Sequence, residues 1–201
     1  MGRQQQFTDD QILEVARACF LEHGPSVSTN VIADKLGVSQ AALFKRFGTK
    51  EELLLAAILP DETMPWVKQV SAGPDPERDL REQLIEIGGI IDEYLSSLVP
   101  RMAVLRSAGF TPEGLCGRYA VPPPVQGHRA MSKWFGHAIK LGMIEAEDPG
   151  ILALTFLGAF HLRHFVHHTF GEALVKSSSR HFIKNLVDTV CRGIETKESA
   201  S

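Results

Sequence analysis

The chain has 201 residues, of which 44% are hydrophobic and 22% charged, and its formal net charge is −3. This balance fits one or two compact domains with apolar cores, and it excludes a protein that binds nucleic acid through its overall charge. Three widely separated cysteines, Cys19, Cys116 and Cys191, predict neither a disulfide framework nor a metal site of C-x-x-C spacing. We expect a cytoplasmic protein without membrane contact, because the N-terminus lacks an apolar signal core and the longest apolar runs are shorter than a bilayer span.

Apolar residues recur at helical spacing along the chain, and the alternation that is typical of strands is missing. We therefore predict an all-α fold. Thr8 with Gln11, and Thr49 with Glu52, form capping-box patterns that each open a helix. Two short helices are expected between these points, over residues 28–36 and 40–47. They are separated by a glycine-containing turn, which is the arrangement of a helix-turn-helix motif over residues 29–48.

The second helix of this predicted motif has one face for burial and one for a charged partner. Leu43 and Phe47 fit a core, whereas Lys45 and Arg46 between them cannot be buried. Residues 39–50 hold three cations and no anion, and cations are what the phosphates and base edges of DNA require. An ordinary amphipathic helix with a solvated face is the alternative that the pattern alone leaves open.

Residues 28–56, STNVIADKLGVSQAALFKRFGTKEELLLA, resemble the DNA-binding domain of the TetR family of bacterial regulators, and the preceding ILEVARACFLEHG fits the first helix of that domain. The resemblance covers roughly residues 8–59. It implies contacts with operator DNA from helix N-termini and from the exposed face of the recognition helix. The implied DNA-binding residues are Thr29, Ser39, Gln40, Ala41, Ala42, Phe44, Lys45, Arg46 and Lys50.

Different members of this set have different implied roles. Thr29, Ser39 and Lys50 are expected to hold phosphates, and the longer side chains of the recognition helix are expected to touch bases. The two alanines are small enough to approach the groove wall. The family usually has tyrosine at the position of Phe44, so a hydroxyl contact with phosphate is impossible here, while ring contact with a thymine methyl remains open.

The chain beyond residue 60 is longer than DNA binding requires. We expect residues 1–60 to form the DNA-binding domain, residues 61–196 a helical ligand-binding and dimerisation domain, and residues 197–201 a disordered tail. The elements predicted in the second domain are a connection or loosely helical link over 61–76, a long helix from Pro76, a short helix over 99–108, a loop-rich stretch over 109–127, a helix from about 124, a helix that begins at Asp148–Pro149 and a last helix from about Ser178.

Gly88 and Gly89 fall in the middle of the long predicted helix, where glycine is unfavourable. They indicate space for a ligand, a kink, or the close approach of another helix. In the ligand interpretation, an effector lies among three apolar helix faces, with His137, Arg106 and Arg129 as candidate polar anchors. The predicted lining is Leu84, Ile87, Gly88, Ile91, Trp134, Phe135, His137, Phe156 and Phe160. Such a lining fits a largely hydrophobic or aromatic small molecule.

The last two predicted helices have wide apolar faces that one small bundle does not absorb, which favours a homodimer. Phe182, Leu186 and Val190 are expected in its interface. The family resemblance implies a ligand-responsive transcription regulator, most commonly a homodimeric repressor that a small effector releases from a palindromic operator in double-stranded DNA.

His161, His164 and His168 lie at helical spacing, which leaves a helical metal-dependent hydrolase as an alternative. We favour an interface or pocket-lining role for these histidines, and we expect no bound metal, no cofactor and no catalytic residues. The sequence contains no recognisable nucleophile triad, phosphate loop or dinucleotide fingerprint. A DNA-binding architectural protein that responds to no ligand is the second alternative.

Overall fold

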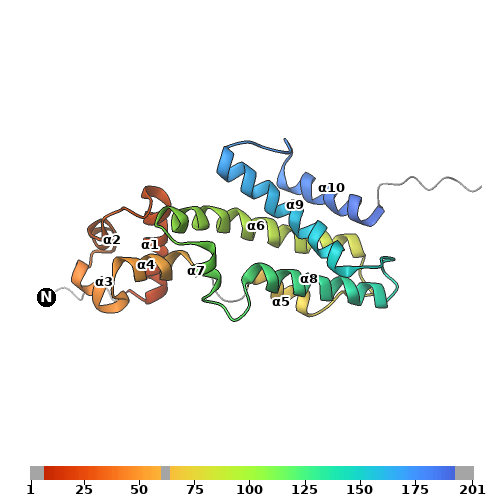
Figure 1. Ribbon diagram of the computed structural model, residues 1–201, viewed down its shortest axis with the longest axis horizontal. Coiled ribbons are helices and arrows are strands. Elements are labelled where there is room, and N and C mark those ends of the chain that lie inside the picture. Colours follow the sequence, from red (N-terminus) through yellow and green to blue (C-terminus); the bar gives the residue numbers. More distant parts are fainter. Residues whose placement is uncertain (1–6, 60–63, 193–201) are drawn as a thin grey trace, which may run out of the picture. The chain divides into compact units, whose positions relative to one another are not determined.

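The computed structural model describes residues 7–59 and 64–192 (Figure 1). All regular secondary structure in these residues is helical, which confirms the predicted all-α fold. The described helices are α1 (Asp9–His23), α2 (Thr29–Leu36), α3 (Gln40–Phe47), α4 (Lys50–Ile58), α5 (Pro65–Ser71), α6 (Leu80–Ser107), α7 (Pro112–Cys116), α8 (Pro123–Lys140), α9 (Pro149–Phe170) and α10 (Ser179–Arg192). The tail predicted at 197–201 lies outside the described residues.

The first four helices begin and end where local signals place them. Both predicted capping boxes are present, at Thr8 before α1 and at Thr49 before α4. Gly37 ends α2 in the left-handed conformation, with φ of 64°, which a residue without a Cβ adopts at little cost. Ser39 then caps α3 by accepting a hydrogen bond from the backbone of Ala42. These short-range bonds set the helix-turn-helix geometry.

The helices divide between two compact units, which we describe separately. The N-terminal unit comprises the described residues of Met1–Asp61 and of Leu98–Arg118, and the C-terminal unit the remainder. Leu105 and Leu115 lie in the same core cluster as the apolar residues of α1–α4, so burial assigns their segment to the N-terminal unit. This differs from the expected continuous domain over 61–196.

A single helix, α6, replaces the two helices that we predicted on either side of residue 98. Pro100 lies inside it and has no N–H to donate to the preceding turn, which usually costs about 3 kcal/mol. Leu95 and Leu105 flank the proline and are almost completely buried. Burial of two leucines contributes about 3–6 kcal/mol, enough to offset the interruption. The predicted break at the proline was therefore wrong.

Two short helices also lie in segments that we predicted as a link and a loop. In the link, α5 starts at Pro65 and buries Trp66 and Val70, which are 3% and 2% exposed. In the loop-rich stretch, α7 is capped by Thr111 and buries Leu115. The helix α5 agrees with the loosely helical alternative for the link. The helix α7 was not predicted, although a proline in the first turn is compatible with a helix.

The core of the C-terminal unit contains a row of aromatic rings from α8, α9 and α10. Trp134, Phe135, Phe156, Phe160 and Phe182 follow one another in edge-to-face contacts, with ring centroids 5.3–6.2 Å apart. The first four are at most 2% exposed. Contacts of this geometry contribute about 0.5–1.5 kcal/mol per pair beyond the area that they bury. The row therefore holds these three helices together.

One helix of this unit is apolar on more than one side. An 18-residue window of α9 has a mean hydropathy of 1.2, so the helix has the length and composition of a membrane span, contrary to our expectation from its shorter runs. Only 22% of that window is buried. Its packing against α8 and α10 is that of a core helix in a bundle, and weighs against a membrane span.

Candidate DNA-binding interface and effector core

The recognition helix α3 is anchored by one face. Leu43 is 1% exposed and lies in the core cluster of the N-terminal unit. Val38 and Phe47 are partly buried and pack against the same cluster. Apolar contacts at both ends of a helix of eight residues fix which face it presents to solvent.

The opposite face of α3 is small, aromatic and basic. Ala41, Ala42 and Lys45 are exposed, and Phe44 is half-buried. In the described part of the chain, neither Lys45 nor Lys50 takes part in an ion pair. The face therefore offers a cation and an aromatic ring beside two methyl groups, a combination that can enter the major groove of DNA.

The predicted phosphate contacts occupy helix N-termini, as expected. Ser39 precedes α3, and Lys50 is the first residue of α4. Thr29 is the first residue of α2, but its side chain is only 4% exposed and its hydroxyl accepts a hydrogen bond from Gln40 Nε2 at 2.5 Å. Gln40 is therefore tied to α2 in this conformation, and a base contact by Gln40 requires this bond to open.

Arg46 is also engaged within the domain. Its Nη1 donates to the backbone carbonyl of Phe7 at 2.7 Å and lies 3.3 Å from Asp9 Oδ1. Both partners belong to the start of α1. The guanidinium of Arg46 is thus directed to α1, whereas the neighbouring Lys45 is not.

Residues 12–57 match the family model described as bacterial regulatory proteins, tetR family. The matched segment spans α1 to α4 and contains the whole helix-turn-helix. Residues 12–57 therefore form a DNA-binding domain of the TetR-family type. The predicted resemblance is confirmed, and with it a helix-turn-helix DNA-binding domain in a transcription regulator.

Solved TetR-family structures share the fold of nearly the whole chain. A TetR/AcrR-family transcriptional regulator from Thermobifida fusca is 18% identical, with a TM-score of 0.62 and coverage of 93% of this chain and 98% of that one. The fatty acid degradation regulator FadR from Bacillus halodurans is 14% identical, with a TM-score of 0.63 and coverage of 96% and 100%. The flavonoid-responsive regulator FrrA is 19% identical, with a TM-score of 0.57 and coverage of 94% and 97%. Identities this low establish the fold alone. No curated protein sequence matches the chain.

Most of the residues predicted to line an effector site are buried in the C-terminal unit. Leu84, Ile87 and Ile91 of α6 are at most 3% exposed. They belong to the same unit as the buried aromatic residues of α8 and α9. His137 lies elsewhere, with its Nδ1 only 3.3 Å from where a Cβ on Gly73 would be. Arg106 is exposed and belongs to the segment that packs with the N-terminal unit.

Gly88 does not leave open room in this core. A Cβ added to Gly88 would lie 2.9 Å from Cγ2 of Ile183 and 3.1 Å from Cζ of Phe160. The same atom on Gly89 would meet nothing within 4 Å. Of the interpretations considered, close helix packing is therefore the one that fits Gly88, because α9 and α10 approach α6 there more closely than any side chain permits.

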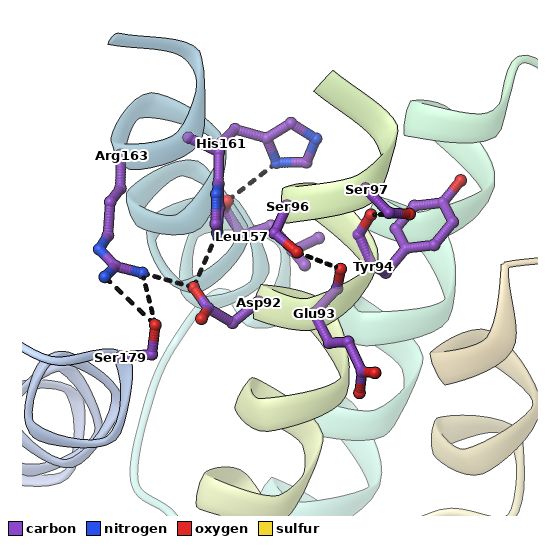
Figure 2. Close-up of polar contacts among 10 residues, drawn as sticks. Asp92, Glu93, Tyr94, Ser96, Ser97, Leu157, His161, Arg163 and Ser179 are labelled. Carbon is purple, nitrogen blue, oxygen red and sulfur yellow. Dashed lines mark hydrogen bonds and ion pairs between the residues drawn. The ribbon is translucent and has the colours of Figure 1, made fainter. Parts of the chain in front are cut away.

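One turn beyond Gly88, a polar cluster that we did not predict joins the same three helices (Figure 2). Asp92 on α6 accepts hydrogen bonds from Arg163 Nη1 at 2.6 Å and pairs with His164 Nε2 at 2.7 Å. Arg163 also donates to Ser179 Oγ at the start of α10 and lies 4.7 Å from the ring centroid of Phe182. The cluster therefore fixes α9 and α10 on α6.

The electrostatics of Asp92 follow from this cluster. Burial raises the pKa of its carboxyl, but hydrogen bonds from Ser179 and His164 and the charges of Arg163 and His164 outweigh burial and hold the pKa below its ordinary value of 3.8. Asp92 is therefore ionised at neutral pH. A lone aspartate in an apolar helix pattern gave only a weak signal in the sequence, because its partners lie more than 70 residues away.

The three histidines predicted to form a stripe on α9 have different surroundings. His161 pairs with the carbonyl of Leu157 at 3.0 Å, His164 pairs with Asp92, and His168 is exposed. Among the described residues, no three histidine, cysteine, aspartate or glutamate side chains gather in an arrangement that could hold a metal ion. The stripe therefore gives no support to the hydrolase alternative.

The predicted interface residues of α10 are half-buried within the chain. Phe182 contacts Phe160, and Leu186 and Val190 flank the buried Val187. A larger apolar surface, which was not predicted, lies on α9. Its large exposed members are Ile151, Leu154, Leu162 and Phe165. The all-round hydropathy of this helix was the signal that could have revealed them.

Proposed function

We propose that this TetR-family protein is a homodimeric repressor that leaves a palindromic operator when a small apolar effector binds its C-terminal unit. The dimer rests chiefly on one observation, the apolar stripe of α9. Ile151, Leu154, Leu162 and Phe165 fall on one side of the helix at 3.6 residues per turn and are 43–60% exposed. Gly158 lies on the same stripe and faces open space, which would let a second helix approach closely.

A second copy of the chain is the proposed occupant of this stripe. Solvent contact along so apolar a helix is unfavourable, at about 25 cal/mol for each Å² of apolar surface. A two-fold axis lets α9 and α10 of one copy cover the same helices of the other, so that each stripe covers its own counterpart. The half-buried Phe182, Leu186 and Val190 would form the edge of this interface.

The proposed effector site is the aromatic core of α8 and α9, next to Leu84, Ile87 and Ile91 of α6. Its residues are apolar and come from separate helices, as in most small-molecule sites. Phe160 and Ile183 pack against Gly88 and leave no gap there. The effector therefore enters by displacing aromatic rings such as that of Phe160. FadR and FrrA are a fatty acid degradation regulator and a flavonoid-responsive regulator, so an acyl chain or a flat aromatic molecule is a suitable first probe.

The proposed mechanism has two conformational states. In one state the two recognition helices match successive major grooves, which lie about 34–36 Å apart. The effector binds the other state more tightly and thereby shifts the equilibrium away from DNA. A ligand with equal affinity for both states would have no effect.

The test begins with selection of bound duplexes from a random pool. We expect a palindrome with half-sites about one helical turn apart, and sedimentation should show a dimer. Selection of a single half-site by a monomer would refute the dimeric mechanism. Fatty acids and flavonoids are then screened for release of the selected operator.

The site of an active effector can be located with the two tryptophans of the chain, Trp66 and Trp134. Trp66→Phe leaves Trp134 as the only tryptophan, and it lies inside the proposed site at 2% exposure. An effector that releases DNA should change the emission of Trp134 with the same concentration dependence. Release without any change in Trp134 would place the effector elsewhere.

A further inference from the structure

We propose that Arg46 is a positioning residue that braces the recognition helix against the start of α1, and that base reading in the last turn of α3 falls to Lys45. This inference rests on DNA binding by α3. Both residues were expected to touch bases. The structure separates them, because the guanidinium of Arg46 is already bound within the domain and the ammonium group of Lys45 is not.

The two partners of Arg46 are themselves held in place. Phe7 offers a backbone carbonyl, and its side chain packs against the core of the N-terminal unit. Asp9 is the first residue of α1 and follows Thr8, whose capping box fixes the backbone there. A planar guanidinium with several donors is suited to holding a carbonyl and a carboxylate at once. The brace therefore connects two ordered points that are 39 residues apart in the chain.

Asp9 also opposes a DNA contact by Arg46. If Arg46 turned to the DNA, the carboxylate of Asp9 would lose its partner while phosphates approached, and like charges at short range repel. Lys45 meets no such obstacle. It is exposed at the preceding position of the same turn, and within the described residues it makes no ion pair. The two cations therefore differ in availability although their sequence context is nearly the same.

Three measurements distinguish a brace from a DNA contact. Loss of a base contact relaxes the preference at one base pair, by about 5- to 150-fold. Loss of a phosphate contact weakens all sequences alike and lowers the slope of log K against log salt concentration by about one. Loss of a brace weakens all sequences alike and leaves the salt slope unchanged, because no counterion is released at the brace.

The experiment measures the affinity of Arg46→Ala, Lys45→Ala and Lys50→Ala for the operator selected by the wild type and for its single base-pair variants, over a series of salt concentrations. We expect Arg46→Ala to lose about 3- to 10-fold on every sequence with the wild-type salt slope. Lys45→Ala should relax one base-pair position, and Lys50→Ala should lower the salt slope. Thermal unfolding of each variant confirms that the domain remains folded.

A double-mutant cycle with Asp9→Asn then tests the pairing itself. Removing a negative charge near DNA strengthens binding in any background, and the cycle cancels that general effect. We expect Asp9→Asn to be about 2- to 5-fold less favourable for DNA binding in the wild type than in Arg46→Ala. The proposal is overturned if the cycle shows no coupling, or if Arg46→Ala relaxes a base-pair preference or lowers the salt slope. A wild-type protein that selects no motif would instead refute DNA reading by α3, and the brace with it.

Discussion

Gly88 and Gly89 are adjacent in the interior of α6, and replacing each with alanine measures how closely the helices of the C-terminal unit pack. Both substitutions add one methyl group to the same helix. At Gly89 the new Cβ would meet nothing within 4 Å. At Gly88 it would lie 2.9 Å from Ile183 and 3.1 Å from Phe160, distances at which the neighbours must move.

The expected free energies follow from these distances. Alanine in place of glycine stabilises a helix interior by about 1 kcal/mol, and Gly89→Ala should show this gain in full. Gly88→Ala gains the same amount and loses about 1–3 kcal/mol to overpacking, since Cγ2 of Ile183 is a short branch next to the backbone and cannot swing aside. We therefore expect Gly88→Ala to be less stable than Gly89→Ala by about 1–3 kcal/mol.

Urea unfolding at 25 °C measures both variants, followed by Trp134 emission in a Trp66→Phe background so that the signal reports the C-terminal unit. Equal stabilisation of the two variants would refute the close packing at Gly88. It would also restore the earlier hypothesis that Gly88 leaves space for a ligand. A larger substitution such as Gly88→Leu is a poor test of effector binding, because it should unfold the core before it blocks a site.

Three further predictions concern a cap, the polar cluster and the dimer. Thr49→Ala should destabilise the protein by about 1 kcal/mol at pH 7. The backbone N–H and the side chain of Thr49 hold the pKa of Glu52 below its usual 4.5, so the contribution of the Glu52 carboxylate to the cap is present above pH 4.5 and is lost as the pH falls through the lowered pKa; unchanged stability of Thr49→Ala at pH 7 would refute the cap. Asp92→Asn should cost about 1–3 kcal/mol in urea unfolding at pH 7, and the deficit should shrink as the pH falls from about 3.8 through the lowered pKa of Asp92, because the unfolded wild type takes up a proton there before the folded protein does; a deficit that is the same at pH 3 would contradict an ionised Asp92. Leu154→Asp should yield folded monomers in sedimentation, whereas Leu141→Asp, at the similarly exposed end of α8, should remain dimeric; a dimeric Leu154→Asp would move the interface away from α9.

Local signals predicted the first four helices well because their information lies within a few residues. A threonine or serine cap with its partner three residues on, and a glycine in the left-handed conformation, define a helix end without help from the rest of the chain. The predicted break between residues 98 and 99, next to Pro100, was wrong because the deciding information is not local. A local penalty was visible in the sequence, but the burial of Leu95 and Leu105 on either side depends on distant elements.

In the candidate site, too, local features could be predicted and contacts between distant residues could not. The exposed basic face of α3 could be predicted, since burial of Leu43 follows from helical spacing and fixes the opposite side. The partners of Arg46 and Gln40 could not, because a carbonyl on Phe7 or a hydroxyl on Thr29 carries no sequence signature of such a contact. Two adjacent glycines were equally uninformative. Only the neighbours of Gly88, on α9 and α10, show that one of the pair is packed and the other free.

The helix α9 links the two halves of the proposed function. One side of it carries Phe156 and Phe160, which belong to the proposed effector core, and the other side carries the stripe that we assign to the second copy. We expect an effector that displaces Phe160 to disturb Phe182, whose ring it contacts, and the packing at Gly88, where Ile183 also lies. A change in the effector core therefore reaches α10 through direct side-chain contacts. On this reasoning the dimer interface is the surface that an effector perturbs first, so effector binding should alter the dimer dissociation constant even when no DNA is present.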